Sequence, residues 1–467
     1  MALRHHRLVS SLPLNYLATA VLCVLALANL PGQDSTRNSA SQDSKQISSG
    51  VLASTAPTYY REVLPILRQH CVACHRGGGI APMSFETYDT AQRYAYLIRN
   101  VTQDKAMPPP FSIPLVGRVT NDPSLTPAQI AALATWANLN SPRGDSHDAP
   151  GLGRDSAPWS IPKPDLIIKM PQPVAIPAMG KLDYVYEIVP TGLTAGRWIQ
   201  MAEVLPLLPA NLLQIMVVIR RPGSHWLRHA PPGTPFTSAA LTSSQDRRWS
   251  EDDILIVDAP GSSPQQFPPT MGKFIPAGSD LVFCAQYITN GVVSSEQSSV
   301  GLVFSKQPPS QRVMTLALED RRFTIPPHAP EFRVAAQGIL RRDVVVLSLF
   351  PLLHLRGKRF EYDVIPPPSG SQDNLDSRME TLLRVNYDLR WQTSYPLSEP
   401  RFLKQGSEIR AVAWYDNSSN NPNNPNPNAS VNWGDQPRDE ILGGFFDVAV
   451  PAAIADRKIL VRRHSRN

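Results

Sequence analysis

Proline constrains the fold of this chain more than any other residue, because 47 of its 467 residues are prolines. A proline lacks the backbone N–H and breaks the interior of a helix, so few stretches of the chain can form a long helix. Charged residues make up 18% of the sequence, well below the share found in coiled coils. We therefore expect many short strands joined by turns, arranged in about two or three domains, and we exclude a coiled coil or a helical bundle.

Residues 1–28 have the three parts of a secretory signal peptide: basic Arg4 and Arg7, an apolar run over 16–27, and small residues at its end. The run is shorter than the roughly 20 residues that span a bilayer, which favours a cleaved signal over a retained anchor. The sequence thus predicts an exported protein, periplasmic or extracellular in a bacterium, with no spanning segment after cleavage. Loss of two basic residues takes the net charge from +6 to about +4, which does not favour nucleic-acid binding.

The rest of the chain divides by composition. We expect a flexible tether over 29–56, a small all-α domain over 57–150, antiparallel β-sandwiches over 151–307 and 308–456, and a solvated basic tail over 457–467. Apolar residues at helical spacing predict helices near 59–67 and 94–101, and Thr126 followed by Pro127 predicts the N-terminus of a third. Asn417–Asn428, which is mostly Asn and Pro, predicts an exposed loop.

Cys71-Val72-Ala73-Cys74-His75 is the attachment signature of c-type haem. The two thiols add to the haem vinyl groups, and the histidine that follows ligates the iron from the same turn of chain. A vicinal redox disulfide or a zinc pair is the alternative, although zinc requires four ligands and no second cysteine pair exists. Cys23 leaves with the signal peptide and Cys284 stands alone, so we expect no disulfide framework.

A low-spin haem iron needs a second axial ligand, and Met is the usual choice for electron transfer. Met83 lies only eight residues after His75, and we expect it to fill the core of the domain. Met107 precedes three prolines that stiffen its backbone, so we predict that Met107 is the ligand. We expect His70 to be a surface or capping residue. The candidates for pairing with the haem propionates are Arg76, Arg99 and Lys105.

A set of motifs in the β-rich part resembles the copper type II, ascorbate-dependent monooxygenases, which include peptidylglycine α-hydroxylating monooxygenase and dopamine β-monooxygenase. The motifs are Pro351-Leu352-Leu353-His354-Leu355-Arg356-Gly357-Lys358, Tyr387-Asp388-Leu389-Arg390-Trp391-Gln392, Asp416-Asn417-Ser418, Val431-Asn432-Trp433-Gly434-Asp435-Gln436 and Asp439-Glu440. The resemblance is strongest to bacterial exported members in which a cytochrome c domain precedes the sandwiches, and it covers most of 57–450. It implies a small all-α cytochrome c domain followed by two antiparallel, jelly-roll-like β-sandwich domains.

The family binds one copper through three His of the first sandwich and one through two His and a Met of the second. The matching positions in this chain are Leu213, Gln214 and Gln286 in the first sandwich, and Leu352, His354 and Ile441 in the second. Only His354 keeps a ligand of the family, so the resemblance predicts that copper binding is lost. By itself, His354 is predicted to be a hydrogen-bonded core residue. We expect His225 and His229 to be solvated loop residues rather than a substitute copper site.

These observations leave three functions open. The one that we favour is an exported c-type haem electron-transfer protein with copper-free sandwiches, which works with a periplasmic redox partner and whose sandwiches bind a small-molecule or peptide ligand. The first alternative is an active copper monooxygenase that hydroxylates a C–H bond with O₂ and receives electrons from the haem. The second is a structural or binding protein in which the haem is incidental.

Overall fold

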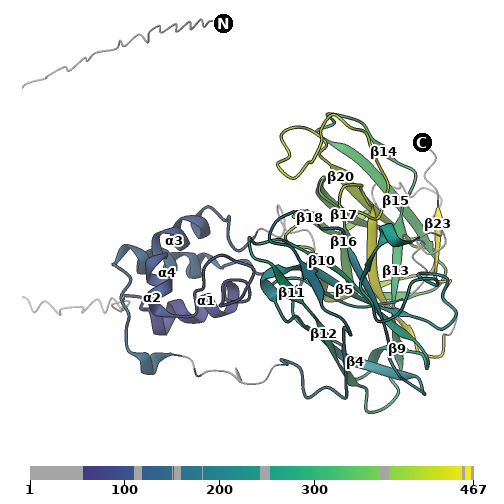
Figure 1. The fold of residues 1–467 in the computed structure, drawn as a ribbon, viewed down its shortest axis with the longest axis horizontal. Helices are drawn as coiled ribbons and strands as arrows, with labels where there is room; N and C mark the ends of the chain where they lie inside the picture. Colours follow the sequence, from purple (N-terminus) through teal and green to yellow (C-terminus); the bar gives the residue numbers. More distant parts are fainter. Residues whose placement is uncertain are drawn as a thin grey trace, which may run out of the picture. The chain divides into compact units, whose positions relative to one another are not determined.

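The computed structural model describes residues 56–109, 118–149, 151, 159–180, 182–241, 253–368, 378–454 and 458–463. The predicted signal peptide, Cys23 and nearly all of the predicted tether lie outside these residues. From Thr55 onward the chain forms one compact unit, in which helices precede a part made mostly of β-strands (Figure 1). No helix in the described ranges is long and apolar enough to cross a membrane.

The helical part packs around one small apolar core. Its elements are a π-helical turn η1 (Tyr59–Val63), α1 (Leu64–His70), α2 (Tyr88–Arg93), α3 (Ala95–Gln103), α4 (Pro127–Asn138) and the 3-10 turn η2 (Ser146–Asp148). Helices lie at the three predicted places, and α2 is additional. The Thr126 side chain accepts from the Gln129 N–H and Gln129 bonds back to Thr126, which confirms the predicted N-cap. Trp136 and Leu133 of α4 are fully buried against η1 and α1.

The β-rich part consists of three larger sheets and two small ribbons. The longest sheet runs in the order β1 (Leu166–Lys169), β12 (Ser299–Phe304), β4 (Arg197–Leu205), β9 (Met271–Ile275), β13 (Gln311–Glu319), β22 (Gly443–Pro451), β16 (Val344–Leu352) and β19 (Tyr395–Leu403), with β8 (Gln265–Gln266) on β4. One five-stranded sheet has β6 (Phe236–Thr237), β3 (Val185–Pro190), β10 (Asp280–Tyr287), β5 (Leu212–Arg220) and β7 (Asp253–Asp258). The other has β18 (Glu380–Asn386), β17 (Gly357–Ile365), β20 (Glu408–Tyr415), β15 (Phe332–Leu340) and β23 (Leu460–Arg463).

The ribbons pair β2 (Val174–Ile176) with β11 (Ser294–Glu296), and β14 (Thr324–Ile325) with β21 (Val431–Asn432). Short 3-10 turns η3 (Pro209–Asn211) and η4 (Ser238–Ala240) complete the described elements. Each five-stranded sheet covers its own half of the long sheet, which gives two sandwiches with separate cores. Strand pairing is antiparallel as predicted, except at one point.

That exception joins the two sandwiches. β9 of the first sandwich pairs in parallel with β13 of the second through Met271–Gln311 and Gly272–Arg312, so one sheet runs through both. A third apolar cluster fills the space between the sandwiches and contains Trp226, Cys284 and Phe445. The sequence predicted two separate sandwiches, because a contact between distant strands leaves no trace in a local pattern.

A buried ion pair crosses the same junction. Lys273 Nζ of β9 lies 2.8 Å from Asp447 Oδ2 of β22, and the Lys273 side chain is 2% exposed. Lys273 also donates to the Ile254 carbonyl, and the Thr315 hydroxyl donates to Asp447 Oδ1 at 2.6 Å. With these partners both charges are satisfied away from water.

One local expectation holds only in part and another was wrong. In the predicted exposed loop over Asn417–Asn428, residues 419–428 are exposed or half-buried, as predicted. Asn417 and Ser418 are buried rather than exposed, because Asn417 Oδ1 accepts from Arg356 Nε at 3.0 Å and its amide donates to the carbonyls of Pro326 and Ala429. In the predicted solvated tail, β23 adds to the edge of β15, and the adjoining Ile459 is fully buried. The apolar run over 459–461 was the signal for this strand.

Loss of one partner from the buried pair is expected to destabilise the protein strongly. Asp447→Ala leaves Lys273 charged and unpaired at the junction, so we expect the free energy of unfolding to fall by about 3–5 kcal/mol. Urea unfolding measures this change. As a control, Glu380→Ala removes an exposed pair with Arg401 and should cost about 1 kcal/mol or less. Equal costs for both variants would show that the Lys273–Asp447 pair does not hold the junction.

Candidate functional site

The residues of the haem-attachment signature form one tight turn directly after α1. The His75 N–H donates to the Cys71 carbonyl at 2.8 Å, and the Cys74 N–H donates to the same oxygen at 3.1 Å. This turn keeps the helical spacing, which places both thiols and the imidazole in one short loop. A Cβ on Gly79 would lie 2.3 Å from the Cys74 carbonyl oxygen, so the chain can fold back over this loop only where there is no side chain.

The His75 ring is held in one orientation. Its Nδ1 lies 3.2 Å from the Met83 carbonyl oxygen, and its face stacks on Phe85 with ring centroids 4.5 Å apart. A backbone carbonyl bonded to Nδ1 fixes the proton there and leaves the Nε2 lone pair for a ligand. Burial lowers the pKa of His75, and the bond to Met83 opposes this shift, so the ring is neutral at pH 7.

Cys71 and Cys74 are free and half-buried. Burial raises the pKa of Cys71 to about 12. Burial also raises the pKa of the Cys74 thiol, while the charge of Arg76 opposes that change. Reactive redox thiols need a lowered pKa, so this pair lacks the electrostatics of a catalytic disulfide. In the described ranges no three His, Cys, Asp or Glu side chains gather in the geometry of a metal site.

The other residues predicted around the loop lie in varied surroundings. Met83 packs against the helical core, which confirms the prediction made for it. Met107 is 41% exposed and its N–H donates to the Val101 carbonyl; residues 110–117 after it lie outside the described ranges, so its role stays a prediction. His70 bonds the Pro123 carbonyl through Nδ1 and Gln129 through Nε2, which ties the end of α1 to the start of α4.

The candidate propionate partners Arg76, Arg99 and Lys105 also stay predictions. Arg99 donates to the side chain of Asn138 at 2.7 Å and lies over the Tyr96 ring. Arg76 lines a cavity between the attachment loop and the first sandwich, and its charge reaches Asp258 at the end of β7. Burial raises the pKa of Asp258 to about 8, and the nearby carboxylate of Glu203 adds to this.

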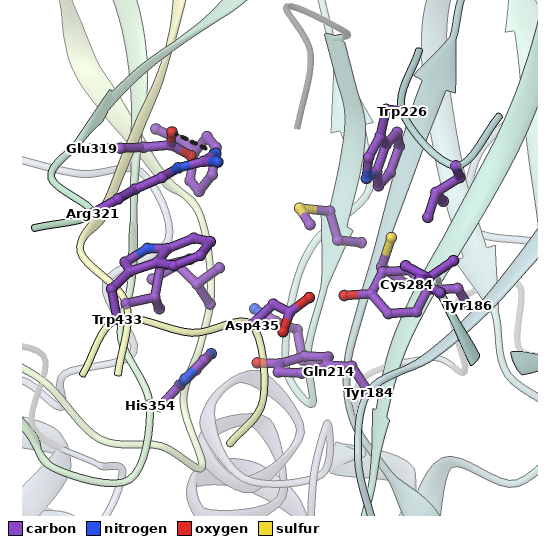
Figure 2. A pocket seen from close by; sticks show the side chains of 16 residues that line it. Tyr184, Tyr186, Gln214, Trp226, Cys284, Glu319, Arg321, His354, Trp433 and Asp435 are labelled. Atoms are coloured by element: carbon purple, nitrogen blue, oxygen red, sulfur yellow. Dashed lines mark hydrogen bonds and ion pairs between the residues drawn. The ribbon is translucent and has the colours of Figure 1, made fainter. Parts of the chain in front are cut away.

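A second candidate site lies between the two sandwiches (Figure 2). Its internal volume is about 90 Å³. Figure 2 shows Tyr184, Tyr186 and Cys284 of the first sandwich facing Trp433 and His354 of the second. Four of the six positions at which the resemblance places copper ligands line this pocket: Gln214, Leu352, His354 and Ile441.

Gln214 and Gln286, the two glutamines at matching positions in the first sandwich, lie opposite each other on neighbouring strands. Gln286 of β10 and Gln214 of β5 are register partners, and both side chains are buried. Gln392 of the second sandwich donates to Gln286 Oε1 at 2.9 Å, and Gln214 Nε2 donates to the Gln392 carbonyl at 3.0 Å. These amides therefore bond one another across the junction. Leu213, beside Gln214, is buried in the same strand.

His354 is a buried, hydrogen-bonded residue, as predicted. Its Nδ1 lies 3.3 Å from the Asp439 carbonyl, its N–H donates to Glu440 Oε2 at 3.0 Å, and Tyr184 packs against its ring. Burial is the main cause that lowers the pKa of His354 to about 4, so the ring is neutral at pH 7. His225 and His229 are exposed in the loop after β5, which confirms the predicted loop position, and the absence of copper there stays a prediction.

Sequence reasoning named Gln214, His354, Trp433 and Asp435 of this pocket but missed its other polar residues. Arg321 lies over the Trp433 ring at 4.7 Å from its centroid and pairs with Glu319 at 3.0 Å. The hydroxyl of Tyr184 has no hydrogen-bond partner among the described residues. Trp433 and Asp435 were part of a quoted motif, but Tyr184 and Arg321 carry no local signal.

Comparison with known proteins adds little. No family model and no curated protein matches the chain. Among solved structures, the VP2 subviral particle of infectious bursal disease virus matches with 9% identity over 58% of this chain and 56% of its own, at a TM-score of 0.19. The Gx strain of that virus matches with 9% identity over 65% and 76%, at the same TM-score. The chain thus spans little more than half the length of the first matched structure. A TM-score of 0.19 assigns neither a fold nor a function.

His354 is expected to make stability depend on pH. Because its folded pKa is near 4 and that of an unfolded His near 6.5, the unfolded state binds more protons between these values. The wild type should therefore lose up to about 3 kcal/mol, relative to His354→Gln, as the pH falls from 6.5 to 4. Urea unfolding across this range tests it. His147→Gln, at an exposed site, serves as the control, and parallel pH profiles for wild type and His354→Gln would contradict the prediction.

Proposed function

We propose that this chain is an exported c-type haem protein that transfers single electrons, and that its β-sandwiches serve as a binding part without copper. The observation that carries the proposal is the orientation of His75, whose Nδ1 is bonded to the Met83 carbonyl in the same loop as two free thiols. This arrangement suits a haem joined by two thioethers, with Nε2 turned to the iron.

The haem, when bound, supplies one reversible electron through its iron. Cys71 and Cys74 would hold the group covalently, His75 would ligate its iron, and Met107 is the candidate for a second iron ligand. The bond to Met83 raises the basicity of the His75 ligand and fixes its plane. Phe85, stacked on that ring, keeps water away from it.

The copper positions support the second half of the proposal. Leu213, Leu352 and Ile441 have no lone pair to offer a metal, and Gln214 and Gln286 are engaged with Gln392. His354 alone has an imidazole, and its Nδ1 is bonded to a backbone carbonyl. Of the six matching positions, only His354 offers a nitrogen or sulfur donor, whereas a copper site of the family needs three. The sulfurs that also line the pocket belong to Met216 and Cys284, which do not stand at matching positions. The pocket between the sandwiches offers aromatic walls instead, which suits a small organic ligand or a peptide side chain.

Covalent haem is the first test. Full-length protein made with a cytochrome c maturation system should carry one covalently bound haem, and Cys71→Ser with Cys74→Ser should lose all of it, because no thioether can form. Cys284→Ser is the matched control and should keep full haem content, since Cys284 lies in the apolar cluster between the sandwiches. A denaturing gel stained for haem and a pyridine haemochrome spectrum provide the readout. Wild type without covalent haem would overturn the proposal.

The axial ligand and the metal content form the second test. Met107→Ala should convert low-spin ferric haem to high-spin and lower its reduction potential, because a thioether ligand raises the potential. Met83→Leu keeps the main-chain carbonyl that holds His75, so its spectrum should match the wild type. After incubation with copper and ascorbate, metal analysis should find iron and no stoichiometric copper. One or two tightly bound copper ions would favour the monooxygenase alternative.

A further inference from the structure

A turn of the second sandwich reaches the haem-attachment loop. Trp391 lies in the turn between β18 and β19, and Gly261 lies in the turn after β7 of the first sandwich. A Cβ on Gly261 would be 2.9 Å from Trp391 Cη2 and 3.7 Å from Cys74 Sγ. The indole edge and the thiol sulfur therefore both lie beside Gly261, on the side where a Cβ would stand. Three parts of the chain that are far apart in sequence meet at this point.

The meeting point borders a cavity. Ala73, Arg76 and Ile80 of the attachment loop line one side, and Pro260 and Gly261 line the other. The free space is about 1240 Å³, counted with the open solvent at its mouth. Gly261 has a φ of +87°, a conformation that other residues rarely adopt, so a side chain at this place would cost both strain and contact. The backbone is thus shaped to let Trp391 and Cys74 come close.

Hydrogen bonds hold the Trp391 turn in place from three directions. Gln392, next in sequence, bonds Gln286 and Gln214 of the first sandwich. The hydroxyls of Thr393 and Ser262 lie 3.1 Å apart, which ties the turn to the one that carries Gly261. Asn121 Nδ2, from the chain just before α4, donates to the Ser394 carbonyl at 2.8 Å. The turn is therefore anchored to both the first sandwich and the helical part.

We propose that the haem site of this chain is completed by the sandwiches: Trp391 and the Gly261 turn form the wall beside Cys74, and Gln392 is the positioning residue of that wall. The inference rests on the proposed haem attachment. Its chemical consequence is exclusion of water from this edge of the site. A drier surrounding disfavours the more highly charged ferric state, so the wall raises the reduction potential. The sandwiches would then raise the reduction potential of the haem in addition to binding a ligand.

The first experiment needs no haem. Full-length protein made without the maturation system is treated with iodoacetamide, and alkylation of each cysteine is followed by mass spectrometry. Trp391→Ala should raise the alkylation rate of Cys74 several-fold relative to that of Cys71, because the indole edge and the Cys74 sulfur, and not Cys71, are the nearest neighbours of Gly261. Trp391→Phe should keep most of the protection. Trp414→Ala, which removes an indole that lies over Arg359 elsewhere in the same sandwich, should change neither rate.

The second experiment uses the haem-loaded protein. Trp391→Ala and Gln392→Ala should each lower the reduction potential while leaving the low-spin absorption spectrum unchanged, and Trp391→Phe should restore most of the loss. Cys74 protection that is unchanged in Trp391→Ala overturns the inference, even if haem is attached. If the wild type attaches no haem while Cys74 is still protected by Trp391, the wall exists and the proposed function is what fails.

Discussion

The arrangement of this protein depends on how its two sandwiches are joined. A parallel pairing of β9 with β13 carries one sheet through both, and the buried pair of Lys273 and Asp447 crosses the same seam. A buried charge is costly without its partner, so the pair favours the arrangement that brings Lys273 and Asp447 together. The pocket, the glutamine contacts and the reach of the Trp391 turn all follow from this fixed arrangement.

At the positions where the resemblance implies copper ligands, this chain has residues that make contacts between the two sandwiches. Gln392 Nε2 donates to Gln286 Oε1 across the junction, and Gln214 Nε2 donates to the main-chain carbonyl of Gln392. Gln392 Oε1 is buried without a hydrogen-bond partner among the described residues. On the second sandwich, Leu352 belongs to the apolar cluster and Ile441 packs against it. In this chain, the residues at these positions thus contact one another or pack in the apolar cluster between the sandwiches.

The helical part is joined directly to the second sandwich, with which it belongs to one compact unit. The chain before α4 bridges to the start of β19 through Val119 and Leu397, and Asn121 bonds the turn that carries Trp391. The same turn holds the glutamines at the edge of the pocket. The segment 387–394 therefore lies between the two candidate sites.

The sequence by itself determined the local features. Residues close in the chain determine the Cys71–His75 spacing, the cap at Thr126 and the prevalence of strands. The interactions behind these features are local, so a sequence pattern is enough to predict them. The tertiary structure alone decided what distant residues make together. The seam at β9 and β13, the bond between Gln214 and Gln392, and the approach of Trp391 to Cys74 join segments that are tens to hundreds of residues apart. Such contacts depend on packing of whole sheets, for which no short motif exists.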